Sequence, residues 1–275
     1  MSGRRSPFLW IGGGIVALVA LVAVLAPALA PYDPRAASGP SLGSPSVAHL
    51  LGTNDAGQDI LSQLIWGTRS SALVAVLAAA LAVGGGVLVG AGAGLLGGWV
   101  DLVTGRILDV FLAVPPLPLI ILIAALARPT LATVILAIGL ASWPQVARIV
   151  RSQTLSLAQR GYLEAARGFG AGPLYPLRRH LIPALGPVIA ANFVYWAGTA
   201  VVLQAGLGFL GLSDPSDVSW GGVLNRALGH EGVYFTSEWL WWVLPAGLVI
   251  TVAAVGLAFL GLALEPRSNP RWRRA

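Results

Sequence analysis

The sequence is poor in charged residues and contains neither cysteine nor lysine. Only 10% of its 275 residues are charged and 56% are hydrophobic, whereas soluble domains carry about a quarter charged residues. The missing cysteine excludes disulfides and thiolate metal sites. All 17 basic residues are arginine, and a Walker A loop needs a lysine at the phosphates of ATP. The composition therefore indicates a membrane protein that carries no Walker A loop of its own.

The residue patterns of common catalytic sites are also missing. The three histidines, His49, His180 and His230, fall in three different loops, so no HExxH or paired-histidine metal site is formed in sequence. No Gly-x-Ser-x-Gly nucleophile elbow occurs. Asp55 and Asp59 could form a carboxylate pair, but we favour a solvated turn. These absences argue against a metalloenzyme, a hydrolase or an intramembrane enzyme.

Ionisable side chains are scarce inside the long apolar stretches. Asp101, Arg106 and Asp109 lie near the edge of one stretch, and Arg106 and Asp109 have the spacing to pair on one helical face. Carriers coupled to protons or sodium normally need buried carboxylates or histidines. The sequence therefore argues against a self-sufficient secondary transporter and favours a structural role for these three residues.

Six apolar stretches are long enough to cross a hydrocarbon core of about 30 Å. Three closely spaced prolines, Pro115, Pro116 and Pro118, predict a kink in the third stretch. The first stretch has a signal peptide as its alternative, but it is longer than the usual apolar region of about 7–15 residues. The six predicted spans are Phe8–Ala30, Ala72–Val100, Ile107–Ala127, Pro129–Ala147, Leu181–Phe209 and Leu240–Leu264.

The distribution of arginine predicts the orientation of these spans. Thirteen of the 17 arginines fall in the two tails, the loop Arg148–Arg179 and the short turn after the second span. Cytoplasmic segments are the ones enriched in Lys and Arg, so both termini and this loop are expected inside. The polar segments Tyr32–Arg69 and Asp214–Glu238 are expected outside. The net charge of +6 is read as this topology signal and not as nucleic-acid binding.

The second predicted span carries a glycine at every fourth position. Gly86, Gly90, Gly94 and Gly98 would share one face of a continuous helix. Small residues at this spacing allow two helix backbones to approach closely in a membrane. We therefore predict that these four glycines form a helix-packing face.

The cytoplasmic loop holds the most distinctive segment of the chain. Residues Tyr162 to Phe169 can form a short amphipathic helix that includes Glu164, Ala165 and Ala166, and Gly170 is a plausible stop after it. Pro183 and two earlier prolines prevent one continuous helix. A short helix at the membrane surface is suited to being held by another protein.

Glu164-Ala165-Ala166, Gly170 and Ile182-Pro183 together resemble the EAA loop of ABC importer permeases. The chain is most similar to the second permease of dipeptide and oligopeptide systems. Further resemblance lies in Leu51–Leu61, where Asn54 and Gln58 replace the usual Asp and Arg and a surface helix is expected over about Gly57–Gly67. Segments Leu207–Leu212 and Ser219–Gly221 also match this branch, although Leu203 and Gln204 stand where acidic residues are usual. That departure leaves the preferred substrate charge open.

The resemblance implies an all-α membrane protein with the type I ABC importer permease fold, six transmembrane helices and both termini cytoplasmic. Residues 1–70 would form the first helix and an extracytoplasmic loop, and residues 71–275 the permease domain with its coupling loop at 151–183. It implies import of dipeptides or oligopeptides across a bacterial or archaeal cytoplasmic membrane, with nickel or another solute as the alternative. The implied partners are a second permease, two ATPase subunits that hold ATP and magnesium, and an extracytoplasmic solute-binding protein. No cofactor is expected in this chain.

Overall fold

The computed structural model describes residues 7–159, 175 and 177–268. This part of the chain is helical, and its β-structure is limited to one isolated bridge between Thr53 and Asp59. The helices are α1 (Pro7–Leu29), α2 (Ile60–Leu96), α3 (Gly98–Ala113), α4 (Pro116–Leu126), α5 (Leu131–Ala158), the π-helix η1 (Leu177–Leu181), α8 (Ile182–Phe209), α9 (Trp220–Gly229), α10 (Glu238–Trp241) and α11 (Val243–Ser268).

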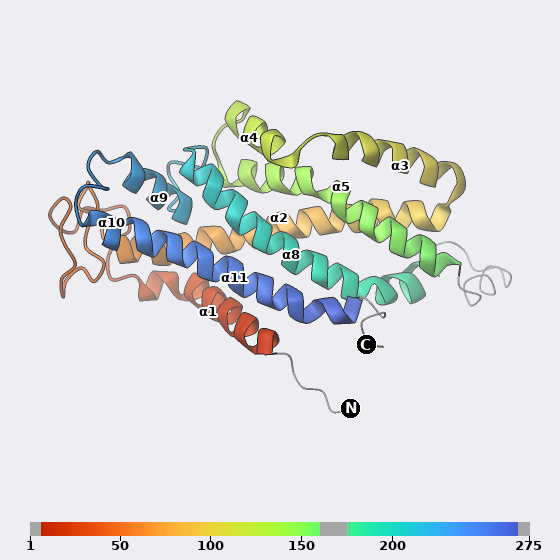
Figure 1. The fold of residues 1–275 in the computed structure, drawn as a ribbon, viewed down its shortest axis with the longest axis horizontal. Helices are drawn as coiled ribbons and strands as arrows, with labels where there is room; N and C mark the ends of the chain where they lie inside the picture. Colours follow the sequence, from red (N-terminus) through yellow and green to blue (C-terminus); the bar gives the residue numbers. More distant parts are fainter. Residues whose placement is uncertain (1–6, 160–174, 176, 269–275) are drawn as a thin grey trace.

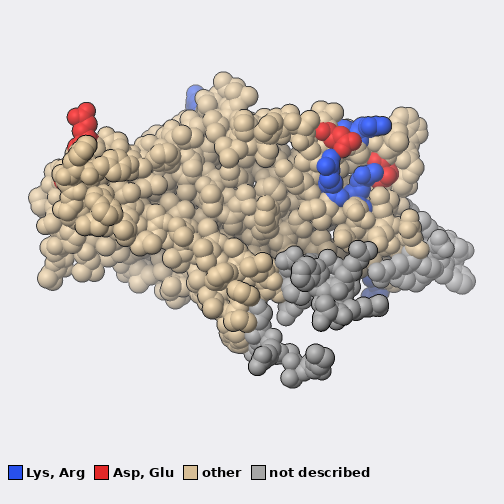
Figure 2. Space-filling view, viewed as in Figure 1, with Lys and Arg blue, Asp and Glu red and all other residues tan. Residues whose placement is uncertain are grey.

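The long helices run side by side in an elongated bundle (Figure 1). One end, called here the loop end, carries residues 30–59 together with α9 and α10; α5 ends and α8 begins at the opposite end. Five helices are long and apolar enough to cross a membrane, and the number rises to six if the bent pair α3–α4 is one span. On the face in Figure 2, one cluster of charged side chains lies over α3 and α5, and only isolated charged groups are visible elsewhere. This is the architecture of a multi-pass membrane protein.

Helix α2 is longer than predicted because it includes the expected surface helix. The prediction of a surface helix at about Gly57–Gly67, separate from a span that begins at Ala72, is wrong. No proline interrupts the region, and a single glycine costs a helix only about 1 kcal/mol. The side chain of Asp59 caps the helix by accepting a hydrogen bond of 2.8 Å from the Ser62 N–H. One 37-residue helix therefore connects the loop end to the opposite end.

Three of the four glycines of the predicted packing face lie against α5. A Cβ atom built on Gly86 would lie 2.5 Å from Val146 Cβ, and one on Gly94 would lie 2.8 Å from Thr154 Cβ. At Gly90 the nearest atom would be a backbone atom, the carbonyl oxygen of residue 147, at 2.5 Å. Real Cβ atoms do not approach so closely, so α2 and α5 meet at a distance that requires glycine.

Gly98 does not belong to this face. Helix α2 ends at Leu96, where Gly97 takes a φ of 64° and donates its N–H to the Ala93 carbonyl at 2.9 Å. Gly98 follows with a φ of 50° and has nothing within 4 Å of a built Cβ. Two successive residues in the left-handed region turn the chain into α3, which is a role that glycine fills without strain.

The predicted kink in the third span is confirmed. Helices α3 and α4 meet at a bend of 76° around Val114 and Pro115. Val114 precedes a proline and is extended, as such residues prefer to be (φ −85°, ψ 125°). Pro116 is the first residue of α4. A backbone N–H at this position has no partner within the helix, so its absence in proline costs no hydrogen bond. The bend lays α4 against α5 instead of continuing the line of α3.

Helix α5 continues well beyond the predicted end of the fourth span. The predicted span ends at Ala147 and leaves Arg148 and Arg151 in a loop, whereas the helix reaches Ala158. Pro144 lies inside the helix without ending it. The two arginines are therefore held in helical positions, and the helix leads directly to the segment that begins at residue 160.

Two clusters of buried apolar side chains hold the bundle together. The larger cluster joins α2, α5, α8, α9 and α11 and includes the fully buried Trp220 and Trp242. The smaller joins α2, α4, α5 and α8 around Ile120 and Ile138. Helix α1 packs on α11, where a Cβ on Gly12 would lie 2.6 Å from the backbone nitrogen of Leu260. The outer faces of α1 and α11 are apolar and exposed, as expected of helices that contact lipid.

We predict that Gly90→Leu destabilises the protein and Gly92→Leu does not. Residue 90 faces the α5 backbone, whereas a Cβ on Gly92 of the same helix meets nothing within 4 Å. Overpacking typically costs about 1–3 kcal/mol, so the first variant should melt at a lower temperature in detergent. Thermal unfolding followed by circular dichroism measures the difference. Equal melting temperatures would show that the two helices separate without cost.

Candidate functional site

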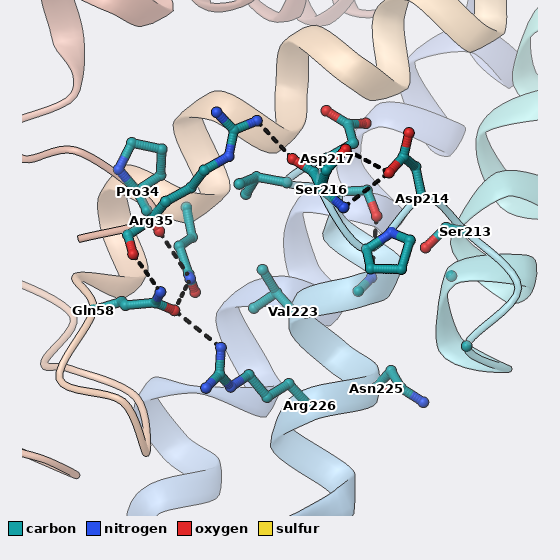
Figure 3. A pocket seen from close by; sticks show the side chains of 17 residues that line it. Pro34, Arg35, Gln58, Ser213, Asp214, Ser216, Asp217, Val223, Asn225 and Arg226 are labelled. Carbon is teal, nitrogen blue, oxygen red and sulfur yellow. Dashed lines mark hydrogen bonds between the residues drawn. The ribbon is translucent and has the colours of Figure 1, made fainter. Parts of the chain in front are cut away.

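A polar pocket opens at the loop end of the bundle. Its volume is about 790 Å³, and its walls come from three segments far apart in sequence: residues 34–63, the turn after α8, and α9. Figure 3 shows Arg35 and Gln58 on one side of the pocket and Asp214 and Ser216 on the other. The wall is completed by side chains including Pro34, Gln63, Ser213, Asp217, Val223, Asn225 and Arg226.

Hydrogen bonds join the three segments around this pocket (Figure 3). Arg35 donates from Nη2 to the Ser216 carbonyl at 2.7 Å, and Gln58 donates from Nε2 to the Arg35 carbonyl at 2.7 Å. Arg226 of α9 donates to Gln58 Oε1 at 3.0 Å and pairs with Asp55 at 2.6 Å. The pocket is therefore a connected surface, because each wall bonds to the next.

The two positions at which Leu51–Leu61 departs from the resembled family contact each other. Asn54 Nδ2 donates to Gln58 Oε1 at 2.9 Å. The Asn54 side chain is fully buried, and its Oδ1 accepts the N–H groups of Ala56 and Gln58, each at 2.9 Å. An uncharged amide pair thus supports this turn.

Asp59 is buried, which corrects the expectation of a solvated turn for this residue. Only 1% of its surface is exposed. One carboxylate oxygen accepts from the Ser62 backbone and hydroxyl, and the other lies 2.9 Å from His49 Nδ1. Asp55 does lie at the surface, paired with Arg226. The two aspartates therefore have separate partners and do not act as a carboxylate pair.

Helix α9 was not anticipated from the sequence, and it explains the segment Ser219–Gly221. Ser219 caps the helix by accepting from the Gly222 N–H at 3.2 Å. Trp220 is buried against Gly67 and donates its indole N–H to the Leu64 carbonyl at 3.0 Å. A Cβ on Gly221 would lie 2.3 Å from the carbonyl oxygen of residue 205. The segment therefore fixes α9 against both α2 and α8.

A half-buried carboxylate links the turn after α8 to α2 and α8. Asp217 accepts a short hydrogen bond from the Ser70 hydroxyl of α2, and Ser70 in turn accepts from Gln204 Nε2 of α8 at 3.2 Å. Burial raises the pKa of Asp217, and the charge of Asp214 adds to this effect. The Ser70 hydrogen bond and the charge of Arg35 oppose it. Gln204 stands at one of the two positions where the resembled family usually has acidic residues. Its amide group donates a hydrogen bond within this network.

Two ion pairs tie α3 to α5 near the opposite end. Asp101 and Arg151 form a bidentate pair with distances of 2.5 and 2.8 Å. Asp109 pairs with Arg148 at 2.7 Å. The spacing in the sequence had pointed to Arg106 as its partner, and the structure corrects this. The extension of α5 causes this difference, because it places Arg148 on a helix beside α3. The structural role predicted for the aspartates therefore involves contacts between helices.

A second groove lies among α4, α5 and α8, in the middle of the bundle. Its volume is about 610 Å³. Most of its wall is apolar, and it includes Leu203, Trp196 and the first turn of α4. Polar side chains line it as well: Ser142 and Gln145 from α5, and Asn192, Tyr195 and Thr199 from α8.

The predicted coupling residues fall mostly outside the part of the chain that the structure describes. Glu164, Ala165, Ala166 and Gly170 lie in residues 160–174, so their predicted role stays a prediction. Pro183 is described and lies in the first turn of α8, where a proline is well tolerated. Among the described residues, no group of three or more His, Cys, Asp or Glu side chains is placed to hold a metal ion.

Comparison with known proteins identifies the family. A family model described as the binding-protein-dependent transport system inner membrane component matches residues 86–274. The chain belongs to this family. A second model, the N-terminal transmembrane domain of oligopeptide transport permease C, matches residues 4–44. The protein is therefore a permease subunit of an ABC importer, a transport component of the inner membrane and not an enzyme.

Curated relatives align with this permease over nearly its whole length. The dipeptide transport system permease protein of Haemophilus influenzae (strain KW20) is 32% identical, and the alignment covers 96% of this chain and 90% of the relative. The nickel transport system permease protein of Escherichia coli (strain K12) is 34% identical over 93% of this chain and 91% of the relative. The resemblance inferred from short motifs is therefore confirmed across the permease.

Asp217 gives a pH-dependent prediction. Since the folded permease holds the Asp217 proton more tightly than the unfolded chain does, protonation stabilises the fold, and this stabilisation is lost as the pH rises through the folded-state pKa. Asp217→Asn keeps an oxygen that can accept from Ser70 but cannot ionise. We expect it to melt at a higher temperature than wild type at about pH 8 and to gain less on acidification to about pH 4.

Thermal unfolding of the detergent-solubilised permease at several pH values provides the measurement. Asp33→Asn, at an exposed position in the same region, is the matched control and should not raise the melting temperature. A melting temperature for Asp217→Asn at or below wild type at the higher pH would contradict the prediction.

Proposed function

We propose that this permease imports dipeptides or oligopeptides across the cytoplasmic membrane of a bacterium or archaeon. The observation that carries the proposal is the match of residues 4–44 to the N-terminal domain of an oligopeptide permease, together with the dipeptide relative aligned over 96% of the chain. The neutral hydrogen-bonding side chains of the central groove suit a peptide. Substrate would reach the loop end from an extracytoplasmic solute-binding protein.

The proposed topology has six spans, with the bent pair α3–α4 as the third and both termini in the cytoplasm. Its support is geometric and electrostatic. The start of α1 and the end of α11 lie toward the same end of the bundle as the junction between α5 and α8 (Figure 1). In the sequence, the arginine-rich loop connects α5 to α8 and the arginine-bearing tails adjoin α1 and α11, so the positive-inside rule makes that end the cytoplasmic one. The loop end with its polar pocket would then face outward.

Energy for transport would come from other subunits. The chain has no lysine and so no Walker A loop, and the proposal places ATP and magnesium on two cytoplasmic ATPase subunits. The segment around Glu164 to Gly170 would rest on one ATPase and transmit its movement. That segment follows α5 and precedes α8, the two helices that line the central groove. A second permease would complete the pathway.

Nickel is the second candidate substrate, because the nickel permease of Escherichia coli is 34% identical to this chain. A permease need not bind the metal through a dedicated site, so the fold does not separate the two candidates. Only transport by the complete assembly does.

The test is uptake by the purified complex in liposomes with its ATPase, partner permease and binding protein. We expect ATP-dependent accumulation of radiolabelled alanine peptides of two to five residues and no accumulation of labelled nickel. The control is the same complex with a non-hydrolysable ATP analogue. ATP-dependent nickel uptake without peptide uptake would favour the second candidate, and uptake driven by an ion gradient alone would overturn the ABC mechanism.

The coupling loop is tested by Gly170→Val. The sequence predicts a left-handed residue after the short helix, and such a conformation costs a residue with a Cβ about 1–2 kcal/mol. We expect the permease to insert normally while peptide uptake falls and ATP hydrolysis loses its dependence on substrate. Glu164→Ala should act more weakly, since a charge at an exposed helix start contributes about 0.3–1 kcal/mol.

The measurements are ATPase activity, uptake and capture of the ATPase subunits by the tagged permease. Sidedness is checked in the same preparations with a single cysteine at Gly161, which should react only from the cytoplasmic side. Normal uptake by Gly170→Val, or labelling of position 161 from outside, would contradict a coupling role.

A further inference from the structure

The polar side chains of the central groove lie on single faces of two helices. On α5, Ser142 and Gln145 are three residues apart. On α8, Asn192, Tyr195 and Thr199 are three and four residues apart. Residues at these spacings lie above one another on a helix surface. The two faces meet across the groove, and α4 forms its third wall because of the bend at Pro115.

Several of these groups have hydrogen-bonding capacity left over. Ser142 is fully buried, and within the described residues its hydroxyl has no partner; the same holds for Gln145 Oε1. Asn192 donates to its own helix at the Val188 carbonyl, 2.9 Å away, which leaves its amide oxygen as an acceptor. Thr199 likewise donates to the Tyr195 carbonyl at 3.0 Å. An unsatisfied polar group in hydrocarbon costs several kcal/mol, so this groove is not built to face lipid.

The wall of the groove carries no charge at neutral pH. None of its twelve described lining residues is Asp, Glu, Lys, Arg or His. The acidic and basic side chains nearest in sequence are bound elsewhere, since Arg148 and Arg151 pair with α3. A charged group that entered the groove would therefore meet dipoles but neither a counter-ion nor a repelling charge.

We propose that this groove is a peptide-backbone site in the translocation pathway, in which Gln145, Asn192 and Thr199 exchange hydrogen bonds with substrate amides and the uncharged wall passes acidic and basic peptides alike. The inference rests on the proposed function. Each peptide unit offers one donor and one acceptor, and the part-exposed amide and hydroxyl side chains of the wall can supply the complementary groups. Selection by side-chain charge would then occur outside this groove.

The size of the groove favours substrate over a partner helix. Ligand pockets usually measure about 300–1,000 Å³, and a volume of about 610 Å³ lies in that range. A helix about 10–12 Å across would need roughly twice the available volume for three turns. A short extended peptide fits, with the second permease closing the open side.

Cysteine labelling tests whether the groove contains water and substrate. The chain has no cysteine, so Asn192→Cys and Thr199→Cys, both at part-exposed positions of the wall, introduce single reactive groups. In the complete complex, with and without ATP and vanadate, we expect both to react with small charged thiol reagents in at least one state. Val24→Cys, on the exposed apolar face of α1, is the lipid control; Val47→Cys, fully exposed in a loop, is the water control.

The charge of the reagent measures the electrostatics of the wall. Cationic and anionic reagents of equal size should react at position 199 in the ratio seen with a free thiol, within about threefold, since no lining charge favours either. Adding Gln145→Glu should shift that ratio by about tenfold or more toward the cation. In uptake assays the same substitution should slow Ala-Glu-Ala more than Ala-Lys-Ala, relative to wild type. Val47→Glu should leave the relative uptake of the two peptides unchanged.

Two results would overturn the inference while leaving the proposed function intact. One is a complex that imports peptides while positions 192 and 199 stay as inert as position 24 in every state, which would mean that a partner helix or lipid covers the groove. The other is an unchanged uptake ratio of the two peptides in Gln145→Glu. A wild-type complex with no ATP-driven peptide uptake would instead refute the proposed function.

Discussion

The close approach of α2 and α5 is the contact on which the rest of the permease depends. Apolar side chains gain little by leaving lipid for protein, so helix association in a membrane relies on packing at short range. Gly86, Gly90 and Gly94 allow this packing because α5 presents backbone and β-branched side chains directly to α2. The position of α5 follows from that contact. This helix then supplies one wall of the central groove, the arginines that bind α3, and the chain that leads to residue 160.

At the loop end, side-chain hydrogen bonds connect segments that are far apart in the sequence. Asp59 caps α2 and contacts His49, and the Trp220 indole reaches the Leu64 carbonyl. Asp217 connects the turn after α8 to Ser70 of α2. These bonds join α2, α8 and α9 at the loop end, and α8 also lines the central groove.

Apolar length and proline position allowed much of the fold to be predicted from the sequence. The ends of α1 and α8 agree within one residue with the predicted spans, because each is bounded by polar or proline-rich segments. The errors share a cause. Residues Gly67 to Ser71 and Arg148 to Ala158 are polar enough to resemble loops, yet both are helical because tertiary contacts hold them. A hydropathy profile does not detect the part of a helix that extends beyond the apolar layer of the membrane.

The candidate site was less predictable than the fold. The glycine spacing indicated a packing face, but it could not show that Gly97 and Gly98 turn the chain, since that depends on backbone angles. Helix α9 had a local signal in the Ser219 cap before Trp220, which was read only as part of a family motif. The groove had no signal of its own, because Ser142 and Asn192 are far apart in sequence and each is unremarkable alone. A groove between helices can be recognised only when the positions of the helices in space are known.

The distribution of charge suggests how transport and energy supply are separated in this molecule. An ion pair holds two helices together between Asp101 and Arg151, and the Asp217 carboxylate accepts a hydrogen bond from Ser70 in the turn after α8. The central groove is left with neutral dipoles that can bind weakly and release. A strong counter-ion there would deepen one binding state and slow the passage of substrate, since every kcal/mol of extra affinity must be overcome on exit. A neutral wall does not create such a strongly bound state.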